Sequence, residues 1–498
     1  MADSTLAALQ ATALAARCHN SFFRQKQLKA LHDALRNDSN TIKDAIKSDT
    51  QVSDNEATTE VALALDLVKE HHNSIKPAKE LEEEYRVANG KDALDRADPW
   101  GVVYIEPQQN HTPFYSAIAA LSAAIVAGNC VALKLENNLR ALPPLLRSLL
   151  SQALEPDTFA TISSAPSQDA LSTTFQVLQE TRVKQPTHMQ LVATQTKVIA
   201  IVDRTADLVA AAEHLVAARF AFGGSSPYAP DLVFVNEFVK KDLLELVLKY
   251  AIPYLASSGD AAINGSAKSP TLGGQKKESK TAEVLKSLGS SKSWRSNVVT
   301  HGSNGAIVDL SNLSSLPPKA NQPIFAVSAI TSLEHAISLI EEDDESSTGL
   351  LAGYYFGAPA AGKYLSQFIK ADVSLVNHIP YRLLLGPAAP SYHTVDIDAR
   401  YTKAHFTRTS PVIIVPTASH STLANVLSGK ESRKVAAQAL SKATQEIKEK
   451  KRAEWIAIGF FEQGILIGLG FYGIPLLVCL GTGLFFGIRA GLTRLSLI

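Results

Sequence analysis

The sequence is poor in cysteine and carries no net charge. Its 498 residues include 3 Cys, and 48 Lys+Arg balance 48 Asp+Glu. Cys18, Cys130 and Cys479 lie far apart and form no CxxC or Cys/His spacing, so we expect neither a disulfide framework nor a metal site. A chain without net charge has no general field that attracts nucleic acid, so we expect no nucleic-acid partner.

The N-terminal segment lacks the features of a secretory leader. Residues 1–23 hold no basic residue before Arg17, and their apolar positions are mostly Ala interrupted by polar residues. A signal peptide has a charged stretch followed by a continuous apolar one. Together with the scattered cysteines, this leads us to expect a reducing compartment. The length and the 46% hydrophobic residues are enough for roughly two to three folded domains.

The C-terminal segment contains one long run without charge. The 26 residues 463–488 include no Asp, Glu, Lys, Arg or His, and as a helix they would extend about 39 Å, enough to cross a hydrocarbon core of about 30 Å. Basic residues at 448 and 450–452 precede this run, so the positive-inside rule predicts that the bulk of the chain is cytosolic. We expect a single-pass, tail-anchored protein that contacts membrane lipid through residues 463–488, with the endoplasmic reticulum as its membrane.

Strand-like and helical patterns alternate through the rest of the chain. The predicted helices cover most of 6–76, then 118–128, 142–154, 207–220 and 238–250, and the predicted strands are 101–105, 131–134, 198–202, 232–235 and 350–356. This alternation indicates α/β domains with parallel sheets. The segment 257–315 is rich in Ser, Gly and Lys, and we expect a long exposed connection there with some helix at 281–288.

Several motifs together resemble the aldehyde dehydrogenase superfamily, and most closely its membrane-anchored fatty aldehyde dehydrogenase branch. They are Asp98-Pro-Trp-Gly-Val-Val-Tyr-Ile-Glu-Pro107, Val126-Ala-Gly-Asn-Cys-Val-Ala-Leu-Lys134 and Gly223-Gly-Ser-Ser-Pro-Tyr-Ala-Pro-Asp231. Their order and spacing match the family to about Val415.

The resemblance implies a fold and a domain order. We expect N-terminal helices and a Rossmann-type dinucleotide-binding domain at 1–200, a catalytic-type α/β domain at 201–385 and a bridging, oligomerisation segment at 386–416. A charged linker at 417–455 and a transmembrane anchor at 456–488 complete the chain. The family binds NAD or NADP and oxidises aldehydes, so it implies these cofactors and an aldehyde ligand. It also implies a homodimer, or a heterodimer with an active relative.

The family's catalytic residues are missing from the matching positions. A cysteine thiolate attacks the aldehyde in this family, and Pro227 occupies that position, which removes both the thiol and a backbone N–H. Ala193 occupies the position of the glutamate that acts as general base. Ser226 is the conceivable substitute nucleophile, but its hydroxyl is protonated at neutral pH and needs a base beside it.

Two further positions retain the family's residue types. Asn110 matches the asparagine that stabilises the oxyanion when counted from Gly101, but one surplus residue before Pro113 makes His111 the alternative. Lys134 matches the lysine that contacts the adenosine ribose of the cofactor.

These losses lead to two hypotheses. The first is a pseudoenzyme with an aldehyde dehydrogenase fold, which cannot run the thiol-dependent reaction and serves as a binding or partner subunit. The alternative is an active NAD(P)-dependent dehydrogenase that oxidises aldehydes, including fatty aldehydes, with a nonstandard nucleophile. The two hypotheses differ in whether aldehyde-dependent NAD(P)H formation occurs.

Overall fold

The computed structural model describes residues 2–256, 272–343, 349–415, 418–430, 433–448 and 460–495. The chain divides into two compact units, Met1–Val415 and Pro416–Ile498. The first unit contains two large sheets, which the α/β pattern of the sequence predicts.

A five-stranded parallel sheet forms the centre of the N-terminal half. Its order is β4 (Phe159–Ile162), β3 (Cys130–Lys134), β2 (Val102–Glu106), β5 (Phe175–Leu178) and β6 (Gln190–Val192). Because side chains alternate along a strand, Val103 and Ile105 pack on one face while Val102 and Tyr104 pack on the other. Both faces are therefore covered, as in doubly wound folds.

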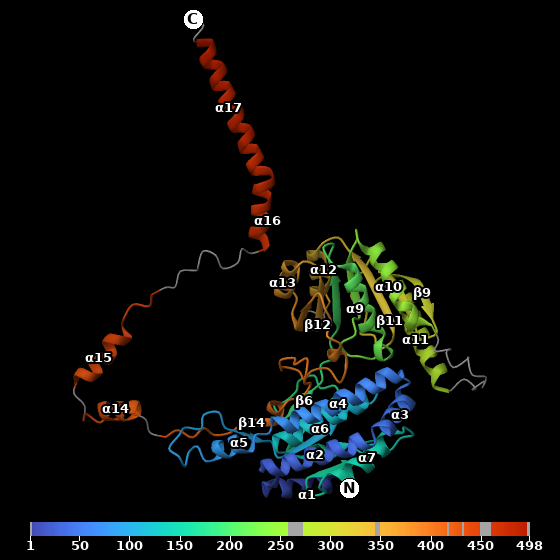
Figure 1. Cartoon of the computed structure of the whole chain (residues 1–498), viewed down its shortest axis with the longest axis vertical. Coiled ribbons are helices and arrows are strands. Elements are labelled where there is room, and N and C mark those ends of the chain that lie inside the picture. Colours follow the sequence, from blue (N-terminus) through green and yellow to red (C-terminus); the bar gives the residue numbers. More distant parts are fainter. Residues whose placement is uncertain are drawn as a thin grey trace. The chain divides into compact units, whose positions relative to one another are not determined.

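The two faces of this sheet are covered by different sets of helices. One face carries α2 (Ser21–Asn37), α4 (Asp54–Ser74), α6 (Pro113–Ala127) and α7 (Leu142–Ala153), and the other carries α1 (Ala2–Leu14). Every residue of α6 is buried, as expected for a helix that is apolar all round. Figure 1 shows α2, α4, α6 and α7 gathered in one bundle.

A seven-stranded sheet forms the centre of the second half. Its order is β13 (Ala371–Val376), β12 (Leu350–Phe356), β7 (Val198–Val202), β8 (Leu232–Asn236), β11 (Ile324–Ile330), β10 (Gly305–Ser311) and β9 (Arg295–Gly302). All neighbours are parallel except β9 and β10. Its helices are α9 (Leu208–Phe220), α10 (Lys240–Leu255), α11 (Leu272–Ser290), α12 (Leu333–Glu341) and α13 (Pro359–Phe368). β7 crosses the predicted domain boundary at residue 200 and pairs with β8 and β12.

The prediction of a long exposed connection at 257–315 was wrong, apart from the helix expected within it. The described part of this segment contains α11, β9 and β10, so it adds two strands to the sheet. β9 is an edge strand, and most of its side chains are exposed. An edge strand of this kind lacks the alternation of apolar and polar residues by which strands are predicted.

The remaining elements of the first unit are short or peripheral. β1 (Ala97–Pro99) pairs antiparallel with β14 (Thr407–Thr409), which lies in the predicted bridging segment. The other elements are η1 (Arg17–His19), α3 (Ser39–Thr50), α5 (Pro77–Glu84), α8 (Gln168–Ser172), η2 (Ala221–Gly224), η4 (Tyr381–Leu384) and η5 (Lys403–Phe406).

The second unit is helical in its described residues. It contains α14 (Ala418–Leu427), α15 (Arg433–Ala443), α16 (Phe460–Gly468), a π-helical turn (Leu469–Gly473) and α17 (Ile474–Leu495). Within the described ranges one helix, Gly464–Arg494, is long and apolar enough to cross a membrane. The predicted uncharged run therefore forms a helix that is compatible with a membrane anchor. Lys448 lies in the described part of the predicted basic collar, and residues 450–452 lie outside it.

Candidate functional site

The loop at 221–231 connects α9 to β8 and carries Ser226 and Pro227. Phe222, Gly223 and Gly224 adopt left-handed φ angles of 52°, 63° and 69°. A Cβ on Gly224 would lie 2.6 Å from the backbone nitrogen of Pro323, so glycine is required there. The loop therefore turns sharply against the segment before β11.

A cluster of buried charged side chains holds this loop in place. Arg219 donates to the carbonyl oxygens of Pro230 at 3.3 Å and Ala320 at 2.6 Å, and its side chain is fully buried. Lys319 donates to the carbonyl oxygen of Pro227 at 2.7 Å and lies 3.4 Å from Asp231. Burial lowers the pKa of Lys319, and the Asp231 carboxylate opposes this shift. The position of Pro227 is thus fixed by contacts within the protein.

His111 contacts the 221–231 loop directly. Its Nε2 lies 2.8 Å from the carbonyl oxygen of Leu384, so Nε2 carries the proton, and its Nδ1 lies 3.0 Å from Ser225 Oγ. Burial lowers the pKa of His111 to about 4, which keeps the imidazole neutral at pH 7. Ser225 was not singled out from the sequence, yet it is the hydroxyl that contacts this imidazole.

Ser225 and Ser226 both donate to backbone carbonyls, and Ser225 Oγ donates to that of Phe222 at 2.7 Å. Ser226 does so from a more buried position. Its hydroxyl donates to the carbonyl oxygen of Leu384 at 2.8 Å, and the residue is only 2% exposed. A backbone carbonyl cannot accept the hydroxyl proton as a general base does. The hydrogen bond that the structure gives Ser226 therefore holds the loop without activating the oxygen.

Asn110 and Ala193 lie in other surroundings. Asn110 is exposed, and its Oδ1 accepts a hydrogen bond from Arg140 at 3.0 Å. The structure thus brings His111 rather than Asn110 into hydrogen-bond contact with the 221–231 loop. Ala193 is buried where the chain passes from β6 to β7, and it forms a bridge with Pro390. Its methyl group supplies no ionisable group for base catalysis.

Lys134 lies at the carboxyl edge of the five-stranded sheet among carboxylates. Its Nζ lies 3.6 Å from Glu106 and 3.4 Å from Glu136. Glu180, which follows β5, accepts a hydrogen bond from the backbone of Gln109 at 2.6 Å. Burial raises the pKa of Glu180, and the charges of Glu106 and Glu136 raise it further. This edge therefore presents negative charge around a single lysine.

The helix N-termini at this edge are already capped by acidic side chains. Glu60 accepts from the backbone N–H groups of Phe114 and Tyr115 at 2.9 and 3.1 Å, at the start of α6. Asp49 accepts from those of Ala141 and Leu142 at 2.7 and 2.8 Å, at the start of α7. In the described residues 179–189, which connect β5 to β6, there is no helix.

A dinucleotide needs free N–H groups at this edge of the sheet. In doubly wound folds the pyrophosphate binds where the strand order reverses, at a free helix N-terminus. Here the order reverses between β2 and β5, where α6 is capped by Glu60 and β5 is followed by Glu180. The residues present do not fit the pyrophosphate of NAD or NADP.

This misfit predicts the outcome of a thermal shift experiment. We expect NAD and NADP to leave the melting temperature of the full-length protein unchanged, because a ligand stabilises a protein only by binding its native state. Differential scanning fluorimetry over a range of cofactor concentrations measures this, with an active aldehyde dehydrogenase as the positive control. A rise that grows with cofactor concentration would contradict the misfit.

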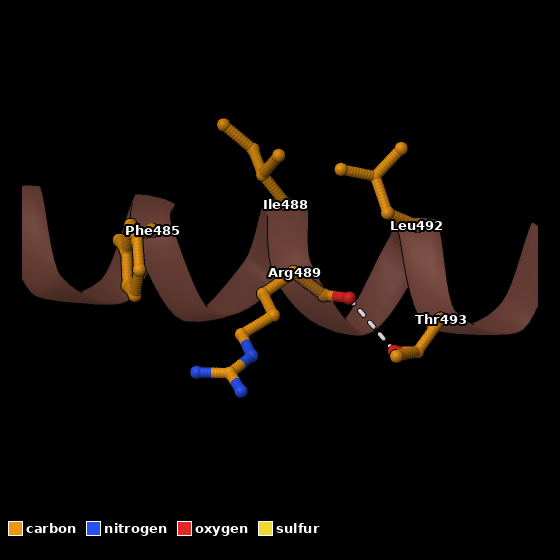
Figure 2. Close-up of a pocket in the computed structure, with 5 residues that line it drawn as sticks. All are labelled: Phe485, Ile488, Arg489, Leu492 and Thr493. Atoms are coloured by element: carbon orange, nitrogen blue, oxygen red, sulfur yellow. Dashed lines mark hydrogen bonds between the residues drawn. The ribbon is translucent and has the colours of Figure 1, made fainter.

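Two other features of the described residues were assessed as sites. No group of three or more His, Cys, Asp or Glu in this part of the chain is placed to hold a metal ion. A shallow hollow is lined by Phe485, Ile488, Arg489, Leu492 and Thr493, which all belong to α17 (Figure 2). Because one helix supplies all of its walls, the hollow is a surface groove and not an enclosed binding cavity.

Comparisons with known proteins agree with this architecture. Residues 3–172 match the model of the aldehyde dehydrogenase family. The chain is 24% identical over 249 residues to 4,4'-diaponeurosporen-aldehyde dehydrogenase of Staphylococcus aureus, covering 46% of this chain and 53% of that protein. It is 28% identical over 162 residues to aldehyde dehydrogenase family 3 member B1 of Rattus norvegicus, covering 31% and 33%. The matched segments thus span about half or less of these relatives.

Solved structures show the same fold over most of the chain. Substrate-bound AldH of Staphylococcus aureus aligns with a TM-score of 0.62 and 17% identity, covering 86% of this chain and 99% of that one. A NAD-dependent benzaldehyde dehydrogenase from Corynebacterium glutamicum aligns with a TM-score of 0.59 and 14% identity, covering 84% and 89%. The fold is that of an aldehyde dehydrogenase. Over residues 3–172 the sequence is also similar to the aldehyde dehydrogenase family.

Proposed function

We propose that this protein is a tail-anchored pseudoenzyme of the aldehyde dehydrogenase superfamily that acts as a binding or partner subunit. The observation that carries the proposal is Pro227, which stands where the family has its nucleophile. Thiol-dependent oxidation requires a thiolate, an oxyanion donor, a base and a hydride acceptor. Proline supplies neither a thiol nor a backbone N–H.

The surroundings of Pro227 support the proposal. Its carbonyl oxygen accepts from Lys319, and the neighbouring Ser226 is buried against Leu384. The acidic side chains that cap α6 and α7 occupy the N–H groups that a cofactor phosphate would use. In this proposal the protein therefore lacks a hydride acceptor as well as a nucleophile.

The proposed partner is a second copy of this chain or an active relative. After β14, Val412 is 54%, Ile413 37% and Ile414 53% exposed, which leaves an apolar run beside the small antiparallel sheet. An exposed apolar patch of this kind favours protein association. Size-exclusion chromatography with light scattering tests the dimer. A monomer at micromolar concentration, unchanged by Ile414→Lys, would argue against it.

The proposed location is the cytosolic face of the endoplasmic reticulum. Residues 464–494 supply the spanning helix, and the charge bias of residues 448–452 supports the orientation. Protease protection in microsomes tests both: we expect the first unit to be digested without detergent. Protection of the first unit would reverse the proposed orientation.

Steady-state kinetics test the proposal against an active dehydrogenase. The specific observation that favours activity is the contact between Ser225 and His111. We expect no aldehyde-dependent NAD(P)H formation from the full-length protein with short-chain and fatty aldehydes. Turnover that is abolished by Ser225→Ala or Ser226→Ala would establish the alternative.

Restoring the thiol alone is expected to leave the protein inactive. Pro227→Cys supplies a nucleophile, but Ala193 still provides no base and the cofactor edge keeps its carboxylates. The measurement is NADH formation with an aldehyde panel, and Pro227→Ser is the matched variant without a thiol. Turnover by Pro227→Cys but not by Pro227→Ser would mean that the thiol is the only part missing.

A further inference from the structure

Cys18 and Cys130 are in contact in the folded protein. Their sulfur atoms lie 3.6 Å apart although 112 residues separate them in the sequence. Cys18 lies in η1 and is 6% exposed, and Cys130 begins β3 and is fully buried. Both are free thiols. A disulfide has an S–S distance of about 2.05 Å, so the two sulfurs would need to approach by roughly 1.5 Å.

The backbones that carry the two cysteines are held together independently of the sulfurs. Arg24 donates to the carbonyl oxygen of Val126 at 2.7 Å and to that of His19 at 3.2 Å. It thereby joins the residue after Cys18 to the end of α6. A Cβ on Gly128 would lie 3.1 Å from the carbonyl oxygen of Cys18, so the two segments also approach closely. These backbone contacts hold the two cysteines next to each other.

The electrostatic surroundings make the two thiols unequal. The hydrogen bond with Cys130 lowers the pKa of Cys18, and the positive charges of Arg17 and Arg24 lower it further. The same hydrogen bond and burial raise the pKa of Cys130. Cys18 is therefore the thiol of the pair that ionises more readily, and the thiolate is the form that reacts with an oxidant.

We propose that Cys18 and Cys130 form a reversible disulfide when the protein meets a hydroperoxide, and that this bond fixes the α1–η1 segment on the five-stranded sheet. The Cys18 thiolate attacks the terminal peroxide oxygen, the O–O bond breaks, and Cys18 becomes a sulfenic acid. Hydroxide leaves from hydrogen peroxide, or an alkoxide from an organic hydroperoxide, and takes up a proton. The Cys130 thiol then displaces water from that sulfenic acid and the S–S bond forms. Two thiols are oxidised by two electrons, and one hydroperoxide is reduced to an alcohol or water, with water as the second product.

Thiol counting on the full-length protein in detergent micelles tests the bond. After treatment with hydrogen peroxide and denaturation, we expect alkylation of one cysteine, Cys479, instead of three, and a peptide map that joins Cys18 to Cys130. Dithiothreitol should restore three. Cys479→Ser is the matched control and should still lose two thiols. Cys18→Ser should lose none in this reaction, and Cys130→Ser should lose only Cys18, as a sulfenic acid with no joined peptide.

Hydrogen exchange tests the consequence of the bond. We expect slower amide exchange in α1 and η1 of the oxidised wild type than of the reduced one, with no such change in Cys18→Ser. Recovery of alkylatable Cys18 and Cys130 after peroxide treatment, or conversion of Cys18 to a sulfinic acid without joining Cys130, would overturn the proposal. Unchanged exchange in the crosslinked protein would overturn the fixation of the segment. The wild-type peptide map decides the matter even where a variant fails to fold.

Discussion

Asp231→Ala is expected to lower the free energy of unfolding by about 3–5 kcal/mol, because removing one partner of a buried ion cluster leaves the others uncompensated. The Arg219 side chain is fully buried 3.8 Å from Asp231, and Lys319 lies 3.4 Å from it. Asp231 also accepts from the backbone N–H groups of Val198 at 2.8 Å and Ala320 at 3.1 Å. In the variant the two backbone N–H groups lose their acceptor, and Arg219 and Lys319 lose the negative charge beside them.

Urea unfolding followed by circular dichroism measures this effect. The matched control is Asp207→Ala, which removes an exposed N-cap that accepts from Val209 at 3.0 Å. Loss of such a cap costs about 1 kcal/mol. Equal losses in the two variants would show that the buried cluster contributes no more than an ordinary helix cap.

The ion cluster around Asp231 has a role in stability that is distinct from any role in catalysis. Asp231 ends the Ala229-Pro-Asp run, and Pro227, which we propose stands at the nucleophile position, lies four residues earlier. The contacts of Asp231, Arg219 and Lys319 all maintain the loop conformation. Folding therefore requires these residues whether or not the protein carries out a reaction.

The sequence predicted β2, β3, β7 and β8 and left other strands unassigned, including the largely buried β10. β2, β3, β7 and β8 are continuous apolar runs, and each lies where the pattern places it. β5 and β6 have only four and three residues and include Gln176 and Gln190, so they give a weak pattern. β9 is exposed along most of its length and gives none.

The candidate site depended on contacts that no local pattern contains. Pro227 can be read directly from the sequence. The contact of His111 with Ser225 cannot, because it joins residues 114 apart. The same holds for the caps from Asp49 and Glu60, which come from other helices. Cys18 and Cys130 show the limit most clearly, because their spacing argued against a pair while the fold brings them together.

Glu60→Gln is expected to remove a large pH dependence of stability. Burial raises the pKa of Glu60 from 4.5 to about 8, although the hydrogen bonds from Tyr115 and Phe114 oppose this shift. Between these pH values the folded protein holds a proton that the unfolded chain has released, so the Glu60 contribution to stability falls as pH rises. Each pKa unit corresponds to about 1.4 kcal/mol, which makes the total loss a few kcal/mol.

The measurement is the difference in unfolding free energy between Glu60→Gln and wild type from pH 4.5 to 9. Glutamine keeps an oxygen that accepts from the α6 backbone, so we expect the variant to gain on wild type through this window and to level off above pH 8. The difference isolates Glu60 from His71 and His111, whose pKa values burial lowers to about 4 and which destabilise both proteins as pH falls below 6.5. Glu70→Gln, at an exposed position of α4, is the matched control and should give a flat difference. A flat difference for Glu60→Gln as well would mean that the α6 N-terminus holds Glu60 as a carboxylate, since a helix N-terminus favours negative charge.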